Sequence, residues 1–178
     1  ARRHQQLDDQ VAVMRRVWAG EAPGPDLHPV GPAPVQAGGP PLYSGALGPK
    51  AIARSARWAT GVAGFLLDPL GEDVAGGFAR IEQAWHDAGR TEAPRHVTSF
   101  WYALGDGAAG HRHEYARGYL GIFGDDLARA MADTCTVHSA DALRAAVDRL
   151  AEAGCDELLL VPTSPDSAHL AEVASLVS

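Results

Sequence analysis

The sequence predicts an α/β protein in which a parallel β-sheet is covered by helices. Four short apolar runs show little alternation between polar and apolar positions, as expected of strands that are buried on both faces. A segment with apolar residues at helical spacing separates each run from the next, and this order of elements is typical of a parallel sheet. The 178 residues, 46% hydrophobic and 21% charged, suit a single globular domain at 1–178.

The elements follow one another regularly along the chain. A first helix is expected at 7–18, where apolar residues recur every three or four positions before Gly20. A loop rich in proline and glycine follows at 21–40. Strands are expected at 41–44, 61–67, 96–104 and 157–161. Further helices are expected at 50–59, 72–88, 139–154 and 167–176, and the less regular segment 105–134 is expected to be helical in its second half.

Composition and charge exclude several classes of function. The formal net charge of −7 argues against a nucleic-acid partner, because binding to phosphates needs clustered Lys and Arg. No apolar run is long enough to cross a bilayer, and no leader segment opens the sequence. The two cysteines, Cys135 and Cys155, do not have the spacing of metal ligands. We therefore expect reduced thiols in a cytoplasmic protein that has no membrane partner.

The turn between the first strand and the next helix is the strongest candidate site. Its residues are Ser44, Gly45, Ala46, Leu47, Gly48, Pro49 and Lys50. Gly45 and Gly48 would let backbone N–H groups approach a ligand, and the start of the following helix favours a phosphate. Pro49 suits the first helical turn, where its missing N–H costs nothing. The alternative is a turn that needs small residues for packing alone, and the residues leave both interpretations open.

Other polar residues have simpler explanations. His111, His113 and Glu114 could bind a metal if they alternated along a strand, but a solvated polar loop is the favoured interpretation, and no metal site is expected. Asp68 is interpreted as a residue that initiates a helix. Tyr102 lies near a strand end and would line a substrate pocket if its side chain pointed along the sheet edge.

Five segments, taken in order, resemble a known family. They are Leu7-Asp8 with Met14–Gly20, Pro41–Lys50, Arg57–Gly61, Ala84–Arg90 and Ala153–Leu160. Together they are similar to the carboxyl-terminal half of the luciferase-like monooxygenase superfamily, the bacterial luciferase-like oxidoreductases that depend on a flavin or a deazaflavin. Thr60 departs from the pattern, because the family usually has Asp before this glycine, and the change is expected to weaken local hydrogen bonding.

The resemblance implies a fold and a function. The fold would be the carboxyl-terminal half of a (β/α)8 TIM barrel, with about four parallel strands and outer helices. The function would be monooxygenation or hydride transfer with reduced FMN or a 5-deazaflavin coenzyme, and the turn at residues 44–48 would meet the cofactor phosphate. The resemblance assigns no catalytic residue, and the direction of the Lys50 side chain is not fixed.

The missing half leaves two possibilities for the role of the chain. In the first, it supplies the cofactor-phosphate half of an oxidoreductase that also binds a small organic substrate. In the second, it is a truncated, catalytically silent half-barrel that acts as a binding or assembly module. In either case two sheet edges would be free, so we expect a homo-oligomer or pairing with a separate amino-terminal half.

Overall fold

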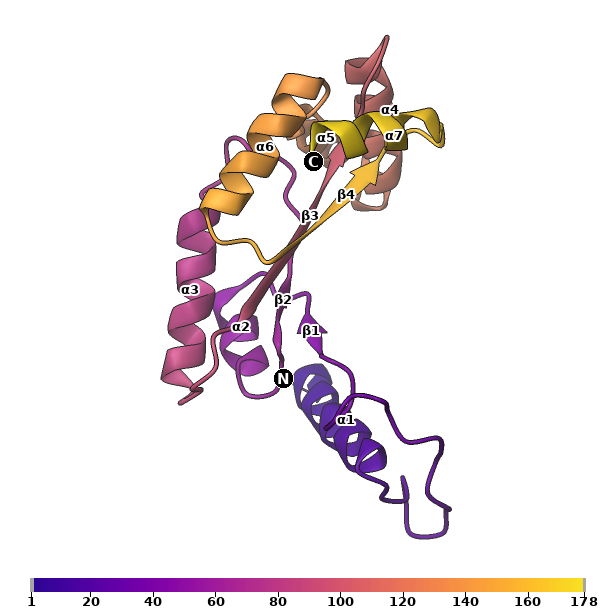
Figure 1. The fold of residues 1–178 in the computed structure, drawn as a ribbon, viewed down its shortest axis with the longest axis vertical. Helices are drawn as coiled ribbons and strands as arrows, with labels where there is room; N and C mark the ends of the chain where they lie inside the picture. The colour runs from indigo at the N-terminus through magenta and orange to yellow at the C-terminus, as the bar shows by residue number, and fades with distance from the viewer. Residues whose placement is uncertain (1, 178) are drawn as a thin grey trace.

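The computed structural model describes residues 2–177 and contains one four-stranded parallel sheet (Figure 1). Its strands are β1 (Tyr43–Ser44), β2 (Gly61–Ala63), β3 (Arg95–Tyr102) and β4 (Glu157–Pro162). They pair in chain order, and every pair is parallel, as the sequence predicts. The second strand is shorter than expected, although Leu66 still bridges to Phe100.

The helices largely follow the predicted order. They are α1 (Arg2–Trp18), α2 (Pro49–Ser55), α3 (Val74–Asp87), α4 (Ala108–Leu120), α5 (Asp125–Thr134), α6 (Ala140–Glu152) and α7 (Ala168–Leu176), and a short 3-10 turn, η1 (Gly121–Phe123), joins α4 to α5. The interpretation of residues 105–134 was wrong in its first half, because α4 begins at Ala108. His111, His113 and Glu114 therefore lie on a helix and not in a loop.

Two apolar clusters lie on opposite faces of the sheet. On the outer face, Phe100 and Tyr102 pack with buried residues of α3 and α6, which lie on one side of the strands in Figure 1. On the inner face, Trp101 packs with buried alanines of α4 and α5 near the carboxyl ends of the strands. Neighbouring residues such as Trp101 and Tyr102 contribute to opposite faces, because successive side chains of a strand point in opposite directions.

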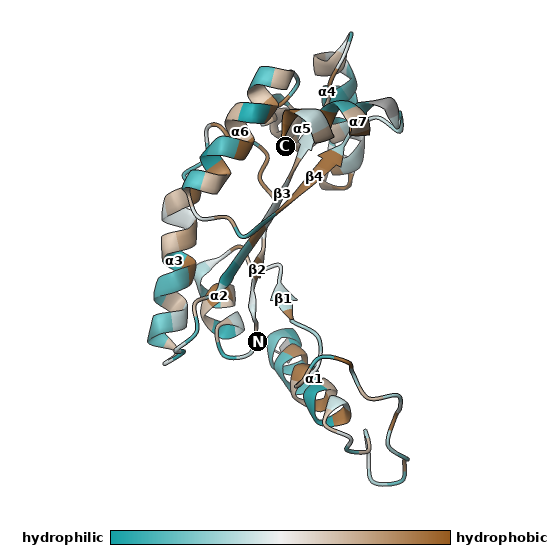
Figure 2. Cartoon of the chain, in the orientation of Figure 1, coloured by the Kyte–Doolittle hydropathy of each residue, from teal (hydrophilic) through white to brown (hydrophobic). Residues whose placement is uncertain are grey.

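The middle of the inner face is open. Leu159 of β4 is 51% exposed, although the neighbouring Leu158 and Leu160 pack against the outer core. In Figure 2 the β4 arrow is coloured as hydrophobic. On the side away from α3 and α6, α4 lies beside its arrowhead, but no helix lies beside the lower part of the strand. An apolar side chain in this position would fill the interior of a closed barrel.

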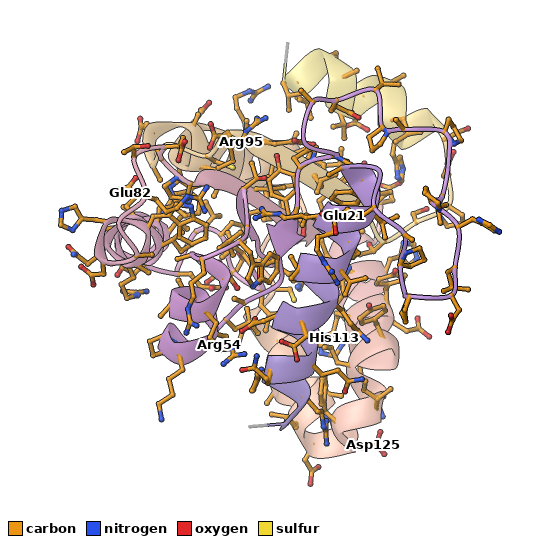
Figure 3. All side chains as sticks on the ribbon, turned by 90° about the horizontal axis from the view of Figure 1, so that it is seen from below. Glu21, Arg54, Glu82, Arg95, His113 and Asp125 are labelled. Atoms are coloured by element: carbon orange, nitrogen blue, oxygen red, sulfur yellow. The ribbon has the colours of Figure 1, made fainter. Side chains whose placement is uncertain are left out.

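Side-chain hydrogen bonds join the helices at the amino-terminal edge of the sheet. Asp8 of α1 accepts from Arg54 of α2 at 2.5 Å and from the Trp58 indole at 3.2 Å, and Figure 3 shows Arg54 beside α1. Arg90 donates to the carbonyls of Ala56 and Ala59 at 2.9 and 3.1 Å, just after α2 ends. Several of the segments that resemble the family therefore hold the fold together.

Thr60 takes part in the same edge of the sheet. Its hydroxyl accepts from the Leu42 amide at 3.2 Å, and its own amide donates to the Leu42 carbonyl at 2.7 Å. The hydroxyl therefore supplies an acceptor where the family usually has a carboxylate. Thr is thus compatible with this position, because the amide and the carbonyl of Leu42 each keep a hydrogen-bond partner.

Candidate functional site

The loops that follow the four strands meet at one edge of the sheet. This arrangement results from the parallel order, because the carboxyl ends of parallel strands lie on the same side. In barrels of parallel strands and helices, such loops build the active site. Helices α4 and α5, inserted between β3 and α6, lie at the same edge (Figure 1).

The turn after β1 is anchored at its start and open beyond it. The Ser44 hydroxyl lies 2.6 Å from that of Ser55, which donates to the Ala51 carbonyl at 2.9 Å and so fastens the turn to α2. A Cβ added to Gly45 or Gly48 would meet no atom within 4 Å. Neither glycine has a positive φ, so neither packing nor backbone conformation requires a glycine here.

The backbone donors of this turn are also free. Within the described part of the chain, the N–H groups of residues 45–48 have no protein acceptor. Gly48 then forms the N-cap of α2 without a side-chain hydrogen bond, and Pro49 occupies the first helical turn as expected. Free N–H groups beside small residues are a common way to bind an anion.

The predicted site residues do not all line one surface, and Leu47 and Pro49 also line a cavity between α2 and α3. Ala46 and Leu47 line a cavity of about 310 Å³ together with the carboxyl end of β2 and the start of α3. Lys50 instead lines a different groove, which α2 shares with His4 of α1, so the structure does not bring Lys50 into the cavity. The positive group at the cavity is Arg80 of α3, whose guanidinium lies 3.6 Å from the Asp73 carboxylate.

Arg80 was not predicted from the sequence, although the signal was present. The residue lies on the predicted helix 72–88, and that helix follows the strand next to the turn. A basic residue on the face nearest the turn was therefore a reasonable candidate. The sequence could not identify this face, because it depends on how α3 rotates against the sheet.

The acidic residues of the loop after β2 organise that loop. Asp68 accepts from the Thr136 hydroxyl at 2.6 Å and from the Leu70 amide at 3.2 Å. Glu72 accepts from the amides of Leu67 and Asp68, both at 2.9 Å. The interpretation of Asp68 as the helix-initiating residue was wrong, because the N-cap of α3 is Asp73, which accepts from the Gly76 amide. Asp68 shapes the loop instead.

A second cavity, of about 620 Å³, lies between α4 and the loop after β4. His111 and Glu114 line it, together with Tyr115, Tyr119 and the polar residues Thr163 and Ser164. His113 does not, since its ring lies 2.8 Å from the Asp133 carboxylate of α5. The two histidines thus serve different surfaces, and among the described residues no cluster suited to a metal ion is found.

In the described part of the chain, Tyr102 lines neither of these cavities. Its side chain is 1% exposed in the outer core, and burial raises the pKa of its phenol above the usual range. Trp101, one position earlier, faces the opposite side and contacts the rings of Tyr115 and Tyr119. The cysteines take no part in either cavity. Both are free thiols, and burial raises the pKa of each.

Comparison with known proteins agrees with this architecture. The model of the luciferase-like monooxygenase family matches residues 1–155. An F420-dependent secondary alcohol dehydrogenase in complex with an F420–acetone adduct superposes with a TM-score of 0.74 and 18% identity, covering 99% of this chain and 62% of that one. No curated protein matches the chain by sequence.

Two further solved structures share the fold. The coenzyme F420-dependent tetrahydromethanopterin reductase from Methanopyrus kandleri gives a TM-score of 0.61 at 18% identity, covering 94% of this chain and 60% of its own. The monooxygenase RslO1 from Streptomyces bottropensis gives 0.53 at 20% identity, covering 89% and 54%. The chain therefore spans less than two thirds of each of these proteins.

These findings fix the family and the kind of fold. The four parallel strands with outer helices form part of a (β/α)8 barrel, as predicted. In the described part of the chain, no helix is long and apolar enough to cross a membrane. Because the family model matches most of the sequence and the fold agrees with it, the chain belongs to the luciferase-like monooxygenase family.

Proposed function

We propose that this chain supplies the cofactor-phosphate half of an oxidoreductase that uses reduced FMN or a deazaflavin. The phosphate would bind at the turn formed by residues 44–50. The observation that carries the proposal is the open turn. Neither packing nor backbone conformation requires a glycine at positions 45 and 48. In addition, the backbone N–H groups of residues 45–48 have no acceptor among the described residues. A ligand that approaches the backbone explains why no side chain occupies this space.

The residues around the turn fit an anion. Ser44 is held by Ser55, so the turn is positioned before any ligand arrives. Arg80 is exposed and lines the adjoining cavity, and its guanidinium can reorient from Asp73 toward a phosphate. Glu72 lines the same cavity, but its carboxylate already accepts two backbone hydrogen bonds. The bound cofactor would supply hydride transfer or oxygen activation, while the protein positions it and excludes water.

The remaining half of the barrel is part of the proposal. The chain spans 62% or less of the solved structures compared above, and Leu159 is exposed where a closed barrel would bury it. We therefore place most of the cofactor-ring pocket outside this chain. The same exposed face supports the second candidate function, a catalytically silent half-barrel that acts as an assembly module.

Substitution of Gly45 by Val tests the phosphate site. The new side chain would occupy the space next to the free N–H groups and stretch or remove hydrogen bonds to a charged ligand. We expect the affinity for FMN or F420 to fall by about 1–3 kcal/mol, or roughly five- to 150-fold. The measurement is a fluorescence or absorbance titration of the intact protein with each cofactor, which also identifies the preferred one.

Gly121→Val is the matched control. Gly121 also has no atom within 4 Å of an added Cβ, but it begins η1, away from the turn. Unchanged affinity in a folded Gly45→Val protein would remove the phosphate role from the turn. If the unsubstituted protein bound neither FMN nor F420, the silent half-barrel would be favoured instead.

A further inference from the structure

We propose that the cavity between α4 and the loop after β4 binds a small planar aromatic molecule that carries a hydrogen-bond donor and no negative charge. Its lining comes from two elements, with His111, Glu114, Tyr115 and Tyr119 on α4 facing Thr163 and Ser164. The volume of about 620 Å³ suits a molecule of one or two fused rings. All of these lining residues belong to the described part of the chain.

The aromatic wall of the cavity is preformed. The rings of Tyr115 and Tyr119 lie 6.4 Å apart and nearly parallel, at 17°. Both make edge contacts with Trp101, at centroid distances of 5.8 and 5.2 Å, and Trp101 is itself only 6% exposed. Tyr119 nevertheless remains 64% exposed and lines the cavity, so its ring surface is available to a ligand there. Such a ring can stack against a planar ligand at little cost in conformational entropy.

The polar groups of the cavity determine which ligand charge it accepts. His111 and Glu114 are three positions apart on α4 and therefore share a face of the helix. Among the described residues, Glu114 has no ion-pair or hydrogen-bond partner, whereas the neighbouring His113 pairs with Asp133 and Arg117 pairs with Asp125. A free carboxylate accepts a hydrogen bond from a phenol or an amine and repels a carboxylate or phosphate.

The two cavities at this edge would therefore select opposite kinds of ligand. The turn after β1 offers backbone donors and Arg80, which suit an anion. The cavity beside α4 offers Glu114, hydroxyl groups and aromatic rings, which suit a neutral or cationic aromatic group. If the proposed function holds, this second ligand is the substrate. Only that identification rests on the proposed function. The binding itself does not require a cofactor.

Titration of the intact protein with β-naphthol and with β-naphthoate tests the proposal. The two probes share a ring system and differ in charge at neutral pH. We expect β-naphthol to bind at least about tenfold more tightly, a difference of about 1.4 kcal/mol. Tyr119→Leu should weaken β-naphthol binding about five- to tenfold through loss of stacking. Glu114→Gln should reduce the preference for the neutral probe, because it removes the repelling charge.

Control variants distinguish binding in this cavity from other causes of a change in affinity. Glu152→Gln changes an exposed acid at the end of α6 and should leave the preference intact. Binding of β-naphthol should change the emission of Trp101, which contacts the tyrosine rings of the cavity. Trp101→Phe should remove this change, while calorimetry still detects binding. Equal affinity for both probes, or unchanged affinity in the folded Tyr119→Leu protein, would overturn the proposal. Loss of FMN and F420 binding with β-naphthol binding retained would count only against the proposed function.

Discussion

Asp8 fastens the first helix to the sheet through two partners at once. One oxygen accepts from the Arg54 guanidinium at 2.5 Å, and the other accepts from the Trp58 indole at 3.2 Å. The ion pair is largely shielded from water, with 27% of the Arg54 side chain and 20% of the Asp8 side chain exposed. An ion pair of this kind contributes more than a fully exposed one, because solvent screens it less.

Asp8→Ala should therefore loosen α1. It would remove both hydrogen bonds and leave a half-buried guanidinium without its carboxylate, so we expect the free energy of unfolding to fall by about 1–2 kcal/mol. Urea denaturation measures this loss. Asp9→Ala is the matched control, since Asp9 is exposed and, among the described residues, accepts only from Gln5 of its own helix. Equal losses in the two variants would show that the Asp8 contacts contribute nothing specific.

At the scale of single elements, the strands were easier to predict than the helices at the sheet edge. The runs at 96–104 and 157–161 lack alternation because both faces pack, and the structure confirms them within two residues at each end. Helix α4, in the first half of segment 105–134, was missed because glycine, histidine and arginine interrupt its apolar pattern. One of these residues, Arg112, is buried between α4 and α5, where it donates to the Ala132 carbonyl.

The candidate site, too, could be predicted from the sequence only in part. The turn at 44–48 could be proposed as a site because glycines beside a strand end are visible in a sequence. The aromatic wall could not, because Tyr115 and Tyr119 lie on the helix that was missed. Tyr102 was considered for a pocket and Trp101 was not, since an error of one position in strand register reverses the face of every side chain.

Strand β2 imposes a requirement on one residue that the sequence does not reveal. Gly61 pairs with Arg95 of β3, and a Cβ at Gly61 would lie only 2.0 Å from the Arg95 carbonyl oxygen. Gly61→Ala should therefore separate β2 from β3 and cost about 3 kcal/mol or more. Gly64→Ala is the control, because its Cβ would meet its nearest atom, the Thr98 hydroxyl, at 3.5 Å. Thermal unfolding should show a large drop for the first variant and a small change for the second, and similar melting temperatures would contradict the close approach.

At the scale of the whole molecule, the open sheet determines how the chain behaves. Among the described residues, β1 pairs only with β2 and β4 pairs only with β3, so both outer strands have a free edge. The edge at β1 is only two residues long, and short edge strands pair poorly with other chains. The edge at β4 is six residues long and apolar over residues 158–162, and Leu159 stands exposed on its inner face. An apolar edge beside an open apolar face favours association.

We therefore expect the isolated 178-residue chain to associate, with a second copy, with a separate amino-terminal half, or by aggregation. Leu159→Lys should weaken that association without unfolding the chain, because it places a charge on the inner face at a position that is already 51% exposed. Leu170→Lys is the matched control, since Leu170 is 56% exposed on α7. Light scattering behind a size-exclusion column measures the mass of each protein. The expected result is a mass well above 18.7 kDa for the parent chain and for Leu170→Lys, with a shift toward that value only for Leu159→Lys. A parent chain that elutes as a cooperatively unfolding monomer would show that the β4 edge and the inner face are tolerated in water without a partner.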